Sequence, residues 1–180
     1  MKTHVKWLLA AVLAAGCGDP RPRNIGGVEG GPVSGAPEAS PAGESVGVDL
    51  QLGAVGAERF SSLLVALDEV RVLADGAPVE VRPTRDLVDL ADTARVETVA
   101  TFALPPGVQR VEVHVGLGAA GGFATGKGSG WVDTWPGALR FEAAGTQLLR
   151  TRHSVVTIDV RRSFVERDQA LVMVPTFRVH

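Results

Sequence analysis

The sequence predicts an all-β protein, an antiparallel β-sandwich of about seven to nine strands. Three observations lead to this prediction. From Ser45 onward, apolar and polar residues alternate in short runs, which is the pattern of half-buried strands. No long stretch after Ser45 carries an apolar stripe at helical spacing. The 180 residues include 22 glycines and 11 prolines, a composition that disfavours a helical bundle.

The composition also limits the class of protein. Hydrophobic residues make up 45% of the chain, enough for a core and too many for a wholly disordered polypeptide. The formal net charge is −2, which gives no general attraction to nucleic acid. The length fits one domain with appendages. We expect a signal peptide over residues 1–16, a tether over 17–44 and the sandwich domain over 45–180.

The first element is an export signal. Lys2 and Lys6 precede an apolar run from Trp7 to Gly16. A membrane-spanning helix needs about 20 apolar residues, so this run is too short to span a bilayer. A basic start, a short apolar middle and small residues at the end are typical of a secretory signal.

Cys17, the single cysteine, directly follows Ala14-Ala15-Gly16, with Leu13 one place earlier. This arrangement resembles a bacterial lipobox, in which the cysteine becomes the acylated first residue of the mature chain. The resemblance implies anchoring to membrane lipid through acyl chains such as palmitate, because two or more chains hold a protein stably on a bilayer. Gly18 after the cysteine resembles the residue that sorts a lipoprotein to the outer membrane. The alternative is an ordinary signal peptide with a cysteine there by chance.

The segment after Cys17 is predicted to be a disordered tether. Residues 18–44 contain seven glycines and five prolines and show no apolar periodicity. Such a stretch buries too little surface to offset its ordering entropy. As a flexible coil it spans about 30 Å.

The strands of the predicted sandwich follow in order. A phase slip near Asp68-Glu69 predicts a bulge, and Asp75-Gly76 predicts a hairpin connection. Pro175 in the last run indicates an edge strand or a bulge. Between Arg85 and Arg95 we expect a turn or one helical loop, and from Gly118 to Gly130 a long flexible loop. The apolar runs are Val46–Leu52, Leu63–Leu67, Val70–Leu73, Val79–Val81, the run ending at Phe102 and Leu104, Val111–Leu117, Val156–Val160 and Leu171–Val179.

The order of these segments resembles a family of exported bacterial domains, the domain of unknown function 4382 family. The segments that carry the likeness are LVALDEVRV (64–72), DLVDL (86–90), LPPGVQRVEVHV (104–115), IDVRRSFV (158–165) and VMVPTFRV (172–179). The chain departs from the family pattern at Val108-Gln109, where an aromatic is usual, and at Arg161, where the family has an acid. The resemblance implies a prealbumin-like or immunoglobulin-like sandwich on an exported lipoprotein, and it implies no established activity.

Trp131, Asp133 and Trp135 form the candidate ligand-binding group. On a strand, residues at i, i+2 and i+4 project from one face. Two indoles on one face can stack on sugar rings while Asp133 bonds to hydroxyls. They can equally fill the end of the sandwich core. Both interpretations stay open at the level of sequence.

Other candidate sites favour plainer interpretations. Gly121-x4-Gly126-Lys127 is followed by Gly128, not by the Ser or Thr that a phosphate loop needs. Asp86, Asp89 and Asp92, together with Asp68-Glu69, match no EF-hand spacing. The histidines are scattered and show no zinc-site spacing: His114, His153 and His180. Five late arginines are expected on a solvated face, paired with acids: Arg150, Arg152, Arg161, Arg162 and Arg167.

We therefore expect no catalytic residue, no metal, no cofactor and no nucleic-acid partner. The sequence predicts a lipid-anchored protein of the cell envelope, with the outer membrane as its expected location. Its sandwich would act as a binding or structural module for an envelope protein or a glycan. The alternative is a surface glycan-binding or hydrolytic protein with its site near Trp131–Trp135.

Overall fold

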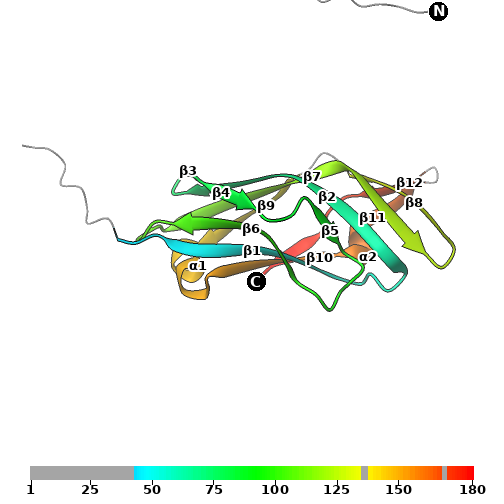
Figure 1. Cartoon of the computed structure of the whole chain (residues 1–180), viewed down its shortest axis with the longest axis horizontal. Coiled ribbons are helices and arrows are strands. Elements are labelled where there is room, and N and C mark those ends of the chain that lie inside the picture. Colours follow the sequence, from blue (N-terminus) through cyan, green and yellow to red (C-terminus); the bar gives the residue numbers. More distant parts are fainter. Residues whose placement is uncertain (1–42, 135–137, 168–169) are drawn as a thin grey trace, which may run out of the picture. The chain divides into compact units, whose positions relative to one another are not determined.

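The computed structural model describes residues 43–134, 138–167 and 170–180, which form two β-sheets packed as a sandwich (Figure 1). This confirms the predicted all-β fold class. Sheet A has five strands in the order β13 (Phe177–Val179), β10 (His153–Asp159), β1 (Val46–Val55), β6 (Glu97–Leu104) and β4 (Val81–Pro83).

Sheet B has eight strands. Six of them lie in the order β11 (Phe164–Arg167), β12 (Ala170–Met173), β8 (Gly128–Thr134), β7 (Arg110–Thr125), β2 (Phe60–Ala74) and β3 (Ala77–Val79). Two further strands join it, β5 (Leu87–Asp89) beside β2 and β9 (Ala138–Ala144) beside β7. The pairs β1–β10 and β8–β12 are parallel and the other pairs are antiparallel.

The predicted alternation places the core between the sheets. Leu50 and Leu52 of β1 and Val113 and Val115 of β7 are buried, and they belong to one apolar cluster. Asp49, between two buried positions of β1, is half-buried on the opposite face. Burying each such apolar side chain contributes about 1.5–3 kcal/mol.

The predicted phase slip in β2 is confirmed. The β2–β7 register shifts on both sides of Leu67, so that Val65 lies opposite Gly121 whereas Leu67 lies opposite Leu117. The additional β7 residues form a bulge, which bends a strand and increases its twist. As a result each long strand has two halves with different neighbours. One half of sheet B holds β5 and β8, and the other holds β3 and β9.

The predicted hairpin at Asp75-Gly76 is also confirmed. Both residues have positive φ, 48° for Asp75 and 84° for Gly76, and Val72 pairs with Val79 across the turn. Two successive positive φ values suit the twist of a hairpin, and Asp-Gly adopts them readily. After β3 the chain crosses from sheet B to β4 of sheet A.

The prediction of a long loop from Gly118 to Gly130 is wrong. These residues form the end of β7, a turn, and the start of β8. Glycine is used there because strands approach closely: a Cβ on Gly121 would fall onto the carbonyl oxygen of Leu64. At Gly118, Gly121 and Gly130 an added Cβ would lie less than 3.0 Å from a neighbouring atom, so at these three positions the absence of a side chain is a packing requirement.

Three other local expectations need correction. Segment 85–95 contains strand β5 followed by turns, where we expected a turn or helical loop. The run through Val160 does not continue as a strand, because α2 (Val160–Ser163) interrupts it after Asp159. Pro175 lies in neither an edge strand nor a bulge: it separates β12 of sheet B from β13 of sheet A. A second short helix, α1 (Gly145–Thr151), connects β9 to β10.

Figure 1 places the beginning of β1 and the β7–β8 turn at opposite ends of the sandwich. The chain enters the domain at one end, and the β8 strand with Trp131 lies toward the other.

Candidate functional site

Trp131 projects from sheet B into solvent. Its exposed fraction is 76%, the largest among the big apolar side chains in the part of the chain that is described. Val132 and Thr134, on the other face of β8, are buried, and Asp133 is exposed on the same side as Trp131. The interpretation of Trp131 as a core residue is therefore wrong, whereas the shared face of Trp131 and Asp133 is confirmed. Trp135 and Cys17 lie outside the described residues.

A glycine opens the surface beside the indole. Trp131 lies opposite Gly122 of β7, and Gly122 lies opposite Leu64 of β2. Directly opposed residues share a face of the sheet. A Cβ on Gly122 would meet only the carbonyl oxygen of Gly130, at 3.7 Å, so this position is open. We call Leu64, Gly122, Trp131 and Asp133 the indole shelf.

The apolar surface continues onto β12 and β11. Val172 lies opposite Asp133, and Val165 lies opposite Val172. Val165 is 56% exposed. Exposed apolar side chains gathered on one face indicate a contact surface more strongly than the same residues scattered singly. Sequence reasoning missed Leu64, Gly122, Val165 and Val172, because their nearness to Trp131 depends on a strand order that periodicity does not reveal.

The indole shelf has a chemistry of its own. An exposed indole face can stack on the flat face of a ring, and the carboxylate of Asp133 can accept hydrogen bonds from hydroxyl groups. Asp89 of β5 lies opposite Leu64, across the sheet from Gly122 and Trp131. Its carboxylate already accepts hydrogen bonds from the backbone N–H groups of Leu63 (2.8 Å) and Ala91 (2.9 Å). Asp133 is thus the acid that the shelf can offer to a ligand.

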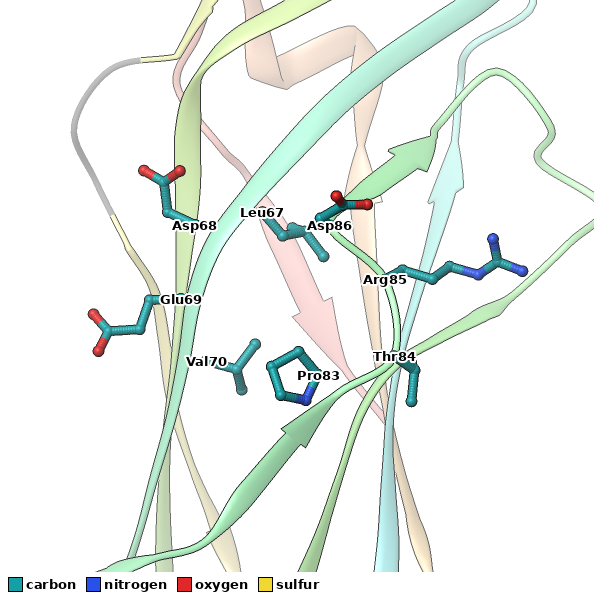
Figure 2. A pocket seen from close by; sticks show the side chains of 8 residues that line it. All are labelled: Leu67, Asp68, Glu69, Val70, Pro83, Thr84, Arg85 and Asp86. Atoms are coloured by element: carbon teal, nitrogen blue, oxygen red, sulfur yellow. The ribbon is translucent and has the colours of Figure 1, made fainter.

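A separate cleft of about 340 Å³ lies where β3–β4 leaves β2 and the chain returns to β5. Figure 2 shows Leu67, Val70 and Pro83 along it, whereas Asp68 and Glu69 point to the other side of β2. The remaining lining residues are Thr84, Arg85 and Asp86. Arg85 extends away from the cleft and forms an ion pair with Glu97 at 3.1 Å. Because the charged side chains of Asp68, Glu69 and Arg85 point away from the cleft, they do not converge on a ligand that could lie in it.

The acidic residues around β5 have structural roles. Besides the contacts of Asp89, Asp92 accepts a hydrogen bond from the backbone N–H of Ala94 at 3.3 Å. Such carboxylate-to-backbone bonds are typical of turns. Within residues 43–134, 138–167 and 170–180, no group of three or more His, Cys, Asp or Glu side chains could hold a metal ion.

Two of the late arginines pair with acids, as expected for a solvated face. Arg161 contacts Glu58 at 3.1 Å and Arg162 contacts Asp159 at 3.6 Å. The pKa of Glu58 is lowered from its ordinary value, chiefly by a backbone hydrogen bond to its carboxylate. Desolvation opposes this effect, and the hydrogen bond and charge of Arg161 lower the pKa further. These pairs are exposed, so they contribute little to stability.

The histidine and glycine-lysine candidates form no site. His114 lies on the outer face of β7, as its alternation predicted, between Arg71 of β2 and Arg140 of β9. The Nη2 of Arg140 is 3.4 Å from its Nδ1. Lys127 lies in the β7–β8 turn, and the strand that follows provides no helix N-terminus for a phosphate.

No helix in the described part of the chain is long and apolar enough to cross a bilayer. Comparison with models of protein families, with curated proteins and with solved structures found no match.

Proposed function

We propose that the protein is a lipid-anchored lipoprotein of the cell envelope, with the outer membrane as its location and the β-sandwich as its extracytoplasmic binding or structural module. The observation that carries the proposal is the position of the single cysteine: Cys17 follows a basic start, an apolar run too short to span a bilayer and three small residues. The resemblance to the domain of unknown function 4382 family belongs to the same proposal.

The fold supports the proposal in one respect. Strand β8, which carries Trp131, lies toward the end of the sandwich opposite the start of β1 (Figure 1), so the indole shelf lies away from the residue at which β1 begins. A tether of 27 residues, 18–44, spans about 30 Å and lifts the domain clear of the headgroups. An exposed shelf on a lifted domain is placed to meet an envelope partner.

Incorporation of radiolabelled palmitate into the full chain tests the anchor. The wild type should incorporate label and Cys17→Ala should not. Trp131→Ala serves as the matched control and should be labelled like the wild type, because its change lies far from Cys17 in the sequence. A wild type that takes up no label, or a Cys17→Ala variant that still takes it up, would remove the basis of the proposal.

A second candidate function is glycan binding at the indole shelf. The 76% exposure of Trp131 favours it, because a large apolar side chain left in water gains by covering its face with a ring. Glycoside hydrolysis needs two carboxyl groups flanking the bond. Asp89 in the same row is already engaged by backbone N–H groups, so binding is better supported than hydrolysis.

A glycan array together with a generic hydrolase screen tests this candidate. Binding should be lost in Trp131→Ala and retained in Val96→Ala, a control that truncates another exposed apolar side chain (49%) just before β6 of sheet A. Silence of the wild type in both assays, or equal binding by Trp131→Ala, would reject the glycan candidate while leaving the lipoprotein proposal in place.

A further inference from the structure

Strand β9 has an unusually long free edge. It pairs with β7 over seven register positions, and no second strand lies beside it in the described part of the chain. The other strands with a single neighbour, β3, β4, β5, β11 and β13, have three or four residues each. A strand edge presents unpaired N–H and C=O groups, which are a template for pairing with another chain.

β9 also lacks most of the features that normally protect an edge. It contains no proline, its register with β7 has no shift, and its inward residues are the buried Leu139 and Phe141. Natural edges are blunted by shortness, proline, bulges, inward-pointing charges or exposed charged side chains. Of these features β9 has the last, Arg140 and Glu142 on its outer face, and these two charges have opposite signs.

The residues of β9 are self-complementary about Phe141. If two copies pair antiparallel with Phe141 opposite Phe141, then Arg140 of each copy lies opposite Glu142 of the other. On the inner face, Leu139 of each copy then lies opposite Ala143 of the other. Opposite charges across strands attract, and like charges directly opposite repel.

The charges also select this register. A pairing centred on Arg140 would place the two arginines opposite each other, and one centred on Glu142 would do the same with the two glutamates. A shift by a single residue would bring the charged outer face of one copy against the apolar inner face of the other, because side chains alternate along a strand. The arrangement centred on Phe141 avoids all three conflicts.

Both charged groups are available for such a contact. Arg140 has no carboxylate within 4.0 Å among the described residues, and the polar contact recorded for its side chain is the 3.4 Å approach to His114. Glu142 accepts a hydrogen bond from Arg110 at 2.8 Å, and its side chain is still 60% exposed. A carboxylate has lone pairs for more than one donor.

We propose that β9 pairs antiparallel with β9 of a second copy of this chain, which extends sheet B across a two-fold axis through Phe141. The contact is isologous, as in most symmetric dimers, so the Arg140–Glu142 charge pair occurs twice by symmetry. The proposal depends on β9 alone and stands independently of the lipid anchor and of the indole shelf.

Sedimentation equilibrium of the full chain in a density-matched non-ionic detergent tests the pairing. The wild type should show a concentration-dependent mass approaching that of two chains. Arg140→Glu and Glu142→Arg should each raise the dissociation constant by about tenfold or more, since both symmetric pairs become repulsive. The double variant Arg140→Glu/Glu142→Arg should restore dimerisation, because the opposite charges are again matched.

Arg82→Glu is the control. Arg82 is an exposed arginine on β4, paired with Glu80, and its reversal should leave the mass unchanged. A wild type with the mass of one chain at all concentrations would overturn the proposal. So would a dimer that both single reversals leave intact, or single variants that dissociate without rescue by the double variant.

Discussion

Asp75 and Arg110 are joined by a reciprocal pair of hydrogen bonds. The backbone N–H of Arg110 donates to Oδ1 of Asp75 at 2.8 Å, and the backbone N–H of Asp75 donates to the carbonyl oxygen of Arg110, also at 2.8 Å. The turn between β2 and β3 is thereby fixed to the first residue of β7. Because β7 pairs with β2, β8 and β9, this contact helps to set the register on which the indole shelf and the free edge of β9 depend.

Replacing Asp75 by alanine should lower the free energy of unfolding by about 1 kcal/mol, since the side-chain acceptor is lost and alanine tolerates a φ of 48° poorly. Asp75→Asn should retain most of the stability, because asparagine keeps an acceptor oxygen and adopts positive φ. Urea unfolding measures both. Equal midpoints for the alanine variant and the wild type would show that the contact contributes nothing.

Two buried serines should respond in opposite ways to alanine. Ser163 is fully buried, its Oγ donates to the carbonyl of Asp159 (2.7 Å), and it accepts from the N–H of Thr176 (2.8 Å). Ser163→Ala leaves that N–H without its partner, so it should destabilise by about 1–3 kcal/mol. Ser154 is also buried, but its Oγ has no hydrogen-bond partner in the described part of the chain.

Ser154→Ala should therefore be neutral or slightly stabilising, because it removes an unsatisfied polar atom from the core. Paired denaturant titrations of the two variants provide the comparison. A larger loss in Ser154→Ala than in Ser163→Ala would contradict the hydrogen-bond assignment at α2.

Adjacent glycines in β7 should differ in their tolerance of a methyl group. At Gly121 a Cβ would fall onto the carbonyl oxygen of Leu64, which is backbone and cannot move aside alone, so Gly121→Ala should cost about 2 kcal/mol or more. Gly122→Ala should cost less than about 1 kcal/mol, because its Cβ would make only an ordinary contact. Thermal unfolding of the two variants distinguishes the positions, and equal losses would count against the bulged packing of β2 on β7.

Trp131 should behave spectroscopically as a solvated indole. The difference between the fluorescence of the wild type and of Trp131→Phe isolates its emission from that of the other tryptophans. This emission should be red-shifted and readily quenched by iodide, because the side chain is 76% exposed. The substitution should change the free energy of unfolding by less than about 0.5 kcal/mol. A blue-shifted, quencher-resistant difference spectrum would mean that the indole is covered.

Sequence periodicity predicted the parts of the fold that burial determines locally. Val113 and Val115 could be assigned to the core because a strand alternates its faces, and the slip near Asp68 could be read as a bulge because alternation broke there. Strand β9 is not predicted from the sequence, although Leu139 and Phe141 alternate there with Arg140 and Glu142 over a short run. The segment around Gly121 reads as a loop because small residues give no hydrophobic signal. Their strand character depends on contacts with distant segments.

The candidate site was predictable only in part. The alternation of Trp131 with Val132 indicated which residues share a face, but not which face is covered. That depends on the order of the strands, which places Gly122 and Leu64 beside the indole and the second sheet on the other side. The anchor at Cys17 remains a prediction from sequence, resting on the chemistry of its surroundings.

Mass spectrometry of the intact protein, purified from membranes of the host in which it is naturally exported, tests the lipoprotein account most directly. We predict a chain that begins at Cys17, lacks residues 1–16 and carries the added mass of a diacylglyceryl group. A mass equal to that of the unmodified 180-residue chain, retaining Met1, would contradict the account.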